Sequence, residues 1–254
     1  MYFRKLLCFV AAIIFSLNSA IALAEEAAPI GLVITQYHVA PGKELGFEEV
    51  SAKFKAAADK VGSQEYFGYS PGLGNPGLYA FAAPFRSYAD LGNNENPLAA
   101  VYKGEELAAI GATFQDSVTD IDSYVIIPRP DLSIPGPERK VPPEVLLLIS
   151  VTIKNDKGEE YAEFLKKLVE ATKATSPDAY WNAFQPGFGS GPVWRFGIAM
   201  NWADLGQPGK SVPQRIMEHF GKRNGEKINA MSTDAVESIE FVVSRVRPDL
   251  THTN

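Results

Sequence analysis

The chain has 254 residues, with 24 Lys and Arg against 30 Asp and Glu, a net charge of −6 and a single cysteine, Cys8. The acidic balance argues against a nucleic-acid-binding protein, because such proteins usually present a basic stripe. One cysteine excludes an intrachain disulfide framework, and the length allows one large domain or two small ones of roughly 100–200 residues.

Residues 1–24 are typical of a secretory signal peptide. Arg4 and Lys5 precede an apolar run at 6–17, and Ala22-Leu23-Ala24 forms a small-x-small cleavage site. The run is shorter than the roughly 20 residues that cross a bilayer, so we expect cleavage rather than a membrane anchor. The mature chain then carries a charge of −8 and no cysteine. This pattern predicts a periplasmic or secreted protein without thiol chemistry and without membrane association.

Three short motifs occur twice in the same order along the chain. They are Pro-Gly-x-Gly at 71–74 and 186–189, Ala-Asp-Leu-Gly at 89–92 and 203–206, and Arg-Pro-Asp-Leu-Ser/Thr at 129–133 and 247–251. The offsets of 115, 114 and 118 are nearly constant, which predicts an internal duplication. We therefore expect two units, 30–133 and 144–251, joined by a Pro-rich linker at 134–143.

The first unit opens with a strand at 32–39, in which two faces alternate, followed by a helix that begins near Gly42. An aromatic segment at 65–69 and the glycine motif then lead into a strand at 78–83. Asn96-Pro97 has the chemistry of a second helix start, because a capping residue stands before an early proline. A strand at 121–127 closes the unit at Pro128.

The second unit repeats this order. Strands are expected at 146–153, 193–200 and 239–246, with an aromatic segment at 180–184. Tyr161, Phe164, Leu168 and Ala171 mark its first helix, and a second helix is expected to start at 211–213.

The predicted fold is α+β, with two tandem β-α-β-β-α-β units of the ferredoxin-like pattern whose sheets bury their open faces against each other. In this order of elements the chain resembles the dimeric α+β barrel superfamily. That superfamily includes antibiotic-biosynthesis monooxygenase-like proteins, stress-responsive A/B barrel proteins, chlorite dismutases and dye-decolorising peroxidases. The resemblance implies an intrachain barrel with a ligand cavity between the sheets. It also implies that one chain completes a pseudo-dimer, acting as a monomer or assembling further as a homo-oligomer.

The candidate ligand-binding residues are Gln36, His38, Tyr66, Trp181, Arg195 and Arg245. Gln36 and His38 share the mixed-polarity face of the first strand, and His38 is suited to act as a general base or to polarise a ligand. The aromatic residues suit a stacking wall, with plain core packing as the alternative. An arginine within a strand suits a carboxylate or phosphate, with an acidic partner or edge stacking as the alternative.

No metal or cofactor is expected from the spacing of the histidines, because none of them is spaced with another ligand along one segment. In haem-binding proteins of this superfamily the iron ligand comes from the second half, where only His219 is available for that role; nothing around it supports haem. His252 falls in a tail that we expect to fray.

Three functions are consistent with these patterns. The first is an exported protein that binds a small, aromatic or anionic molecule between the two sheets. The second is a cofactor-independent monooxygenase-like enzyme that uses the same cavity. The third is a structural or interaction module whose barrel is filled by side chains.

Overall fold

A computed structural model describes residues 29–92, 96–138, 141–207 and 209–253. The predicted signal peptide at 1–24 lies outside these ranges. Among the helices that are described, none combines the length and the apolar character that a membrane crossing requires.

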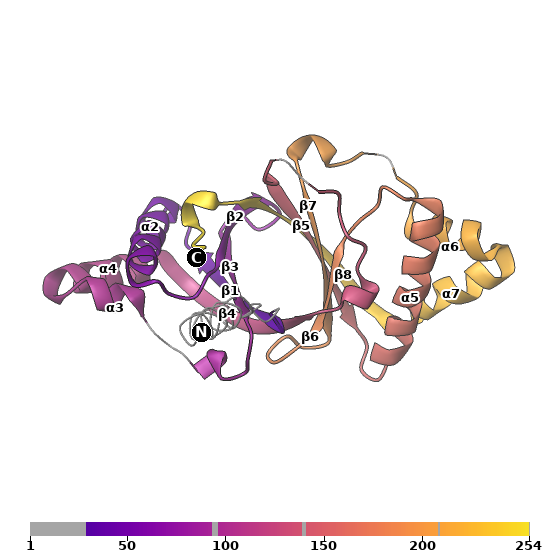
Figure 1. Ribbon diagram of the computed structural model, residues 1–254, viewed down its shortest axis with the longest axis horizontal. Helices are drawn as coiled ribbons and strands as arrows, with labels where there is room; N and C mark the ends of the chain where they lie inside the picture. Colours follow the sequence, from indigo (N-terminus) through magenta and orange to yellow (C-terminus); the bar gives the residue numbers. More distant parts are fainter. Residues whose placement is uncertain (1–28, 93–95, 139–140, 208, 254) are drawn as a thin grey trace, which may run out of the picture.

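Eight strands form one closed barrel in which every neighbouring pair is antiparallel, in the order β1-β3-β2-β8-β5-β7-β6-β4 (Figure 1). The strands are β1 (Gly31–Val39), β2 (Phe67–Leu73), β3 (Leu78–Phe85), β4 (Val118–Pro128), β5 (Val145–Ile153), β6 (Asn182–Pro186), β7 (Val193–Met200) and β8 (Val236–Val246). The α+β class and the barrel are therefore as expected. The two halves also pair edge to edge, through β2–β8 and β4–β6, so a single sheet encircles the barrel.

Helices cover the outer face of the barrel on two opposite sides (Figure 1). In the described ranges they are α2 (Glu44–Val61), α3 (Pro97–Val101), α4 (Gly104–Ser117), α5 (Gly158–Thr175), α6 (Val212–Phe220) and α7 (Lys222–Ala235). The helix starts predicted at Asn96-Pro97 and at 211–213 are confirmed, because Asn96 and Ser211 both accept hydrogen bonds from the first helical turn. Each predicted second helix is in fact two. Gly104 (φ 55°) and Gly221 (φ 74°) adopt positive φ, which breaks a continuous helix there.

The Pro-Gly-x-Gly motifs extend strands rather than forming only a turn. Gly72 in β2 lies against β8, where a Cβ would stand 2.5 Å from the carbonyl oxygen of Val243. Gly187, which follows β6, lies against β4, where a Cβ would stand 2.9 Å from the carbonyl oxygen of Val125. Both glycines therefore allow the close backbone approach that joins one half of the barrel to the other.

The repeated Arg-Pro-Asp-Leu motifs form two 3₁₀ turns, η2 (Pro130–Leu132) and η4 (Pro248–Leu250), that dock on the opposite half. Leu132 is fully buried in the core of the second half, and Leu250 lies against Gly68 of the first. The predicted linker is partly docked too, because Ile134 pairs with the backbone of Trp181.

The C-terminal tail does not fray at His252, contrary to the expectation from its position. This ring is 3% exposed, with Nδ1 2.6 Å from Asp59 Oδ1 and Nε2 3.0 Å from the Ser63 carbonyl. Its backbone pairs with Tyr66. The tail is therefore fixed to α2 by hydrogen bonds that sequence position alone does not reveal.

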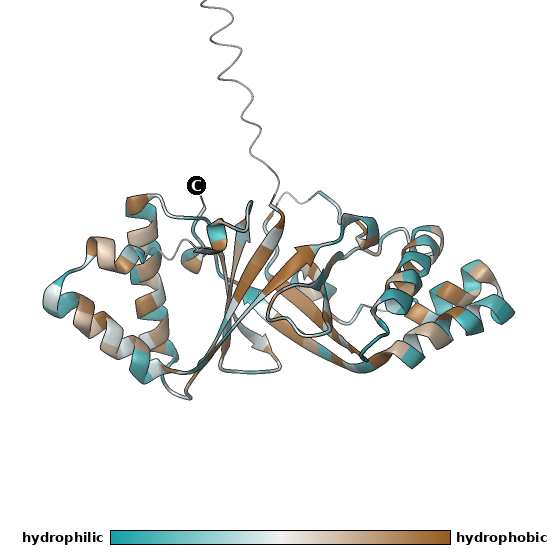
Figure 2. Cartoon of the chain, turned by 90° about the horizontal axis from the view of Figure 1, so that it is seen from below, coloured by the Kyte–Doolittle hydropathy of each residue, from teal (hydrophilic) through white to brown (hydrophobic). Residues whose placement is uncertain are grey.

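The larger hydrophobic core lies between the second half of the sheet and α5, α6 and α7. Hydrophobic residues are frequent along the strands in the middle of the molecule (Figure 2). It includes Phe164, Leu168, Trp181, Trp194 and Ile216. The corresponding buried cluster of the first half is smaller and centres on Phe47 and Tyr79. These cores show which face of each strand points to the helices, so the remaining face points into the barrel.

Candidate functional site

The interior face of β1 carries Gln36 and His38. Their neighbours Tyr37 and Val39 pack on the opposite face with Phe47 of α2. Successive strand residues point to opposite sides, so Gln36 and His38 point away from the helices. Register places Asp122 opposite Gln36 and Asp120 opposite His38 on β4.

In the second half the interior face carries Ser150 and Arg195. Val151 and Trp194, their neighbours along β5 and β7, belong to the helix-covered core, and register pairs Ser150 with Arg195 on one side and with Glu240 on the other. β1 and β5 are separated by four antiparallel pairings and so run in the same direction. His38 and Ser150, both towards the C-terminal ends of these strands, therefore lie towards the same end of the barrel.

The interior face is partly accessible to solvent. Along β1 every residue from 32 to 38 is half-buried, and along β5 the same holds from 146 to 150. The interior residues Ile34 and Leu148 are among them. A barrel filled by its own side chains would bury this face fully.

Arg195 is the most unusual residue of the interior. It is only 9% exposed, and its guanidinium carbon stands 3.9 Å from the centre of the Tyr124 ring. Nη1 donates to the Ser190 hydroxyl and, at 3.3 Å, to the Val193 carbonyl. Among the described residues no carboxylate lies within 4.0 Å of this guanidinium, although the charge of Glu240 acts on it from further away.

Burial shifts the pKa of both members of this stacked pair. Desolvation lowers the pKa of the Arg195 guanidinium, an effect that Tyr124 and Glu240 oppose. Desolvation raises the pKa of the Tyr124 hydroxyl, which the nearby Arg195 charge opposes. Tyr124 therefore stays protonated at neutral pH, and its ring stabilises the cation through its π face without neutralising it.

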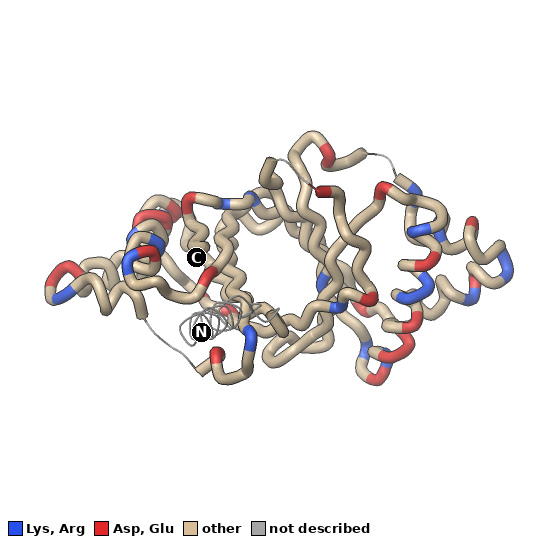
Figure 3. Tube along the Cα trace, in the orientation of Figure 1, with Lys and Arg blue, Asp and Glu red and all other residues tan. Residues whose placement is uncertain are grey.

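His38 lies at the rim of the interior beside two carboxylates. Its Nε2 stands 3.2 Å from Asp122 Oδ2, with the two side chains 32% and 57% exposed. Charged residues are numerous on the outer helices and sparse around the barrel (Figure 3). The His38–Asp122 pair is therefore a local feature of the barrel and not part of a generally charged surface.

The structure brings Gln36, His38 and Arg195 to the interior face and places the other three predicted site residues elsewhere. Tyr66 packs with Phe54 and Phe81 beneath α2. Trp181 lies in the second core, where its indole donates to the Leu132 carbonyl at 2.9 Å. Arg245 is exposed on the opposite side of the sheet and stacks on Trp202. For these three the core or edge-stacking alternative describes the contacts.

Sequence reasoning missed Tyr124, Asp120 and Asp122. All three belong to the last strand of the first half, where the alternation between 120 and 124 was the available signal. Their partners come from β1 and β7, and the pairing of distant strands is not encoded in a local pattern.

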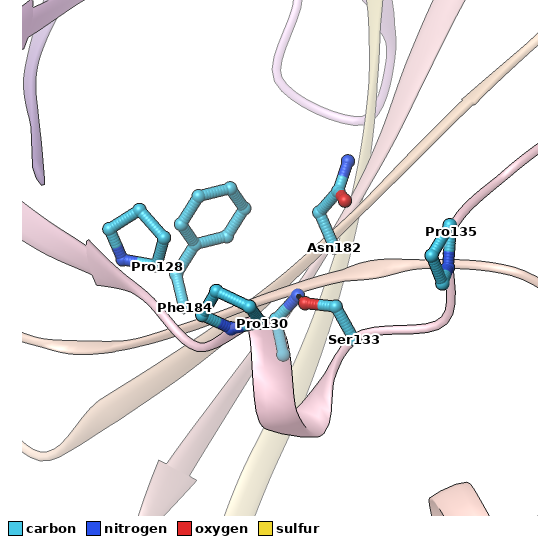
Figure 4. Close-up of a pocket in the computed structure, with 7 residues that line it drawn as sticks. Pro128, Pro130, Ser133, Pro135, Asn182 and Phe184 are labelled. Carbon is cyan, nitrogen blue, oxygen red and sulfur yellow. Dashed lines mark hydrogen bonds between the residues drawn. The ribbon is translucent and has the colours of Figure 1, made fainter. Parts of the chain in front are cut away.

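A pocket of about 250 Å³ lies where β4 meets β6 and the following chain crosses over them (Figure 4). Its lining consists of Pro128, Pro130, Ser133, Pro135, Asn182, Ala183 and Phe184. The Ser133 hydroxyl already bonds the Arg129 carbonyl and the Ala183 amide. With few free polar groups, this pocket offers less chemistry than the interior around Arg195.

The surroundings of His219 do not fit a haem. Its Nε2 stands 3.2 Å from Glu170 Oε1, and its ring packs edge-on against Phe220. The space between these helices and the sheet is filled by the buried core described above, with Phe164, Leu168 and Trp194 in it. A planar macrocycle would have to displace that core.

Comparison with known proteins locates the fold. No family profile matches the sequence, and no curated protein matches it. Among solved structures, an anthrone oxidase-like protein superposes with a TM-score of 0.53 at 12% identity, covering 86% of this chain and 92% of the other. A monooxygenase candidate from Lactobacillus acidophilus NCFM gives 0.49 at 15% identity, covering 89% and 96%. A mutant chlorite dismutase from Candidatus Nitrospira defluvii gives 0.44 at 8% identity, covering 86% and 92%.

At these identities the similarity concerns the fold alone. The superposition on the anthrone oxidase-like protein supports the arrangement of strands and helices described above. The chain is thus a mixed α+β protein built around an eight-stranded antiparallel barrel.

Proposed function

We propose that this chain is an exported protein that binds a small anionic molecule with an aromatic or apolar body inside the barrel. Arg195 carries the proposal, because it is a buried cation on the interior face without a carboxylate partner among the described residues. A charge without an opposite charge away from water costs free energy, and an anionic ligand would complete the pair.

Two further observations support an anionic ligand with an apolar body. Half-buried apolar side chains stand near Arg195, with Phe184 paired to it across β6–β7 and Leu148 two positions from Ser150 along β5. Arg195 also has no counterpart in the first half, where Ala80 pairs with Gln36. A single anchor on one side of the interior suits a ligand that is charged at one end.

Catalysis without a cofactor is the alternative use of the same interior. The specific observation in its favour is the His38–Asp122 pair, since a carboxylate beside an imidazole orients a general base. The module with a filled barrel is disfavoured by the half-buried interior faces of β1 and β5.

The origin and location of the protein belong to the same proposal. We infer that the chain arose by duplication of a ferredoxin-like unit, supported by the three motif pairs and by the matching order of elements in the two halves. We infer export from the sequence of residues 1–24, and a monomeric working form from a barrel that one chain completes.

Binding of anions is tested on the purified mature chain by native mass spectrometry for a co-purified ligand, and by calorimetric titration with benzoate, salicylate, indole-3-acetate and phenyl phosphate. We expect saturable binding of at least one of these probes. Arg195→Met should weaken it by roughly 30–150-fold, the equivalent of about 2–3 kcal/mol for a charged hydrogen bond.

Arg245→Met is the matched control, because Arg245 also stacks on an aromatic ring but lies on the other side of the sheet. It should leave binding unchanged. Absence of binding to every probe, or equal affinity in the Arg195 variant, would contradict the proposal. Turnover in the presence of oxygen that disappears in His38→Ala would favour the enzyme instead.

A further inference from the structure

His38, Asp120 and Asp122 come from two strands and converge at the rim of the barrel. One ligand atom from each lies within 4.8 Å of both others. Bonds from a first-row divalent cation to nitrogen or oxygen are about 2.0–2.2 Å long, which places the ligands of one ion roughly 3–4 Å apart. The three side chains thus need only a small contraction around an ion.

The pairing of β1 with β4 explains why these residues meet. His38 stands directly opposite Asp120, and Gln36 stands opposite Asp122. Asp120 and Asp122 are two residues apart on one strand, so their side chains share a face at roughly 7 Å between Cα atoms. The register shifts between His38 and Val39, and such an irregularity re-aims a side chain at the end of a strand.

Charge at this rim is not balanced by the described residues. Asp122 has His38 as its ion-pair partner, and neither Asp120 nor Asp122 has a described lysine or arginine within 4.0 Å. Two neighbouring carboxylates without a cation repel each other, and an imidazole beside them supplies the nitrogen ligand that distinguishes a transition-metal site from a plain acidic patch.

The ligand set is confined to one half of the barrel. The second half has no comparable ligand set, because Thr152 and Ser238 occupy the positions of His38 and Asp120. The chain therefore concentrates one His and two carboxylates on one side only.

We propose that His38, Asp120 and Asp122 bind one divalent transition-metal ion, of the zinc or manganese type, at the barrel rim. Three protein ligands leave coordination positions open for water or for an anionic ligand. This site goes beyond the proposed binding of an anion and does not require it. It also replaces the expectation of no metal site, which considered only ligands spaced along one segment.

A simple His–Asp ion pair is the competing explanation, and the chain contains its own comparator. His219 and Glu170 stand at the same 3.2 Å as His38 and Asp122. Within the described part of the chain no third ligand joins His219 and Glu170, whereas Asp120 joins the other pair. Asp120 therefore distinguishes a metal site from an ion pair.

The test is a calorimetric titration of the metal-free mature chain with Zn²⁺, together with the visible spectrum of added Co²⁺. We expect one ion per chain. Asp120→Asn should weaken binding at least 10-fold, since even residues outside the ligand set cost 10–100-fold. His38→Ala should weaken it at least as much and change the Co²⁺ spectrum, while circular dichroism reports that both variants remain folded.

His219→Ala should keep the wild-type affinity and stoichiometry. Arg195→Met should do so too, which separates failure of the metal site from failure of the anion site. No saturable binding of Zn²⁺ or Mn²⁺, or the same affinity in Asp120→Asn as in the wild type, would overturn the proposal.

Discussion

On the interior face of the first half stand His38, Asp122 and Tyr124, while Thr152, Glu240 and Val242 occupy the corresponding positions of the second. Arg195 reverses the comparison, because the first half has Ala80 at its place. The helix-covered faces differ in the opposite sense, with the larger core in the second half. The outer differences concern packing against the helices, and the inner ones concern charged and polar residue types.

The connections between the halves are, by contrast, nearly the same on both sides. Each ends in an Arg-Asp clamp, Arg129 with Asp131 and Arg247 with Asp249, and each docks a leucine on the opposite half. In each, a hydroxyl accepts a hydrogen bond from a backbone amide of the opposite half. Ser133 accepts from Ala183, and Thr251 accepts from Gly68. Variants of matching positions therefore separate what the halves share from what only one of them has.

The largest effect is expected from the docked leucines. Leu132→Ala and Leu250→Ala should each lower the free energy of unfolding by about 2–5 kcal/mol, because both side chains are fully buried. Urea denaturation measures it, with Phe188→Ala, 70% exposed, as a control that should change little. A loss in only one of the two leucine variants would break the equivalence of the connections.

The next largest effect is expected from the two glycines, Gly72 and Gly187, that lie where one half of the barrel joins the other. Gly72→Ala and Gly187→Ala should each cost about 1–3 kcal/mol, because the added Cβ meets a carbonyl oxygen of the neighbouring strand. Gly111→Ala in α4 is the control, since nothing lies within 4 Å of its Cβ position and alanine favours helix. Unchanged melting temperatures of Gly72→Ala and Gly187→Ala would show that the neighbouring strands can move apart at little cost in free energy.

A smaller effect on stability is expected at Glu48 of the first half. Its carboxylate accepts hydrogen bonds from Arg247 Nη1 at 2.6 Å and from the Tyr79 hydroxyl at 2.9 Å. The hydrogen bond from Arg247 lowers the pKa of the Glu48 carboxyl below its ordinary 4.5. The contribution of ionised Glu48 to the free energy of unfolding is therefore complete above about pH 5 and is lost as pH falls through the lowered pKa.

Glu48→Gln should cost about 1–2 kcal/mol at pH 7 and almost nothing at pH 2. Chemical denaturation of both proteins across this range measures the difference. Gln185→Ala, at the corresponding contact of Arg129, should show no such dependence on pH. A difference that stays constant from pH 7 to pH 2 would mean that the charge of Glu48 contributes nothing.

The smallest effect on stability is expected at Arg195. Arg195→Met removes a buried charge while keeping much of its volume, so the free energy of unfolding should stay within about 1 kcal/mol of the wild type or rise. Denaturation at pH 7 without added ligand measures it. A loss above about 3 kcal/mol would assign Arg195 a structural role and remove the interior asymmetry as an argument for binding.

Much of the fold follows from local patterns. Alternating strand faces predicted β1 to within a residue, and Asn96 and Ser211 predicted two helix starts through capping. These features depend on neighbours in the chain, and they are therefore visible without a structure. The breaks at Gly104 and Gly221 were missed because each depends on a positive φ, which the sequence pattern did not indicate.

The candidate site depended on pairing between strands. Gln36 and His38 were predicted as interior residues from the face of their strand, and the structure places them there. For Arg195 the interior was one of two alternatives, and the structure places it there too. Tyr66, Trp181 and Arg245 lie on the other side of the sheet. The sequence of a strand does not show which of its two faces the helices will cover.

The sequence by itself determined the order of elements, the repeated motifs and the residue types available for chemistry, since each depends on contacts within a few residues. Only the tertiary structure decided that His38 meets Asp120 and Asp122, and that Arg195 meets Tyr124. Those contacts span more than 70 residues, and they depend on register and barrel closure, which are set by the packing of all eight strands together.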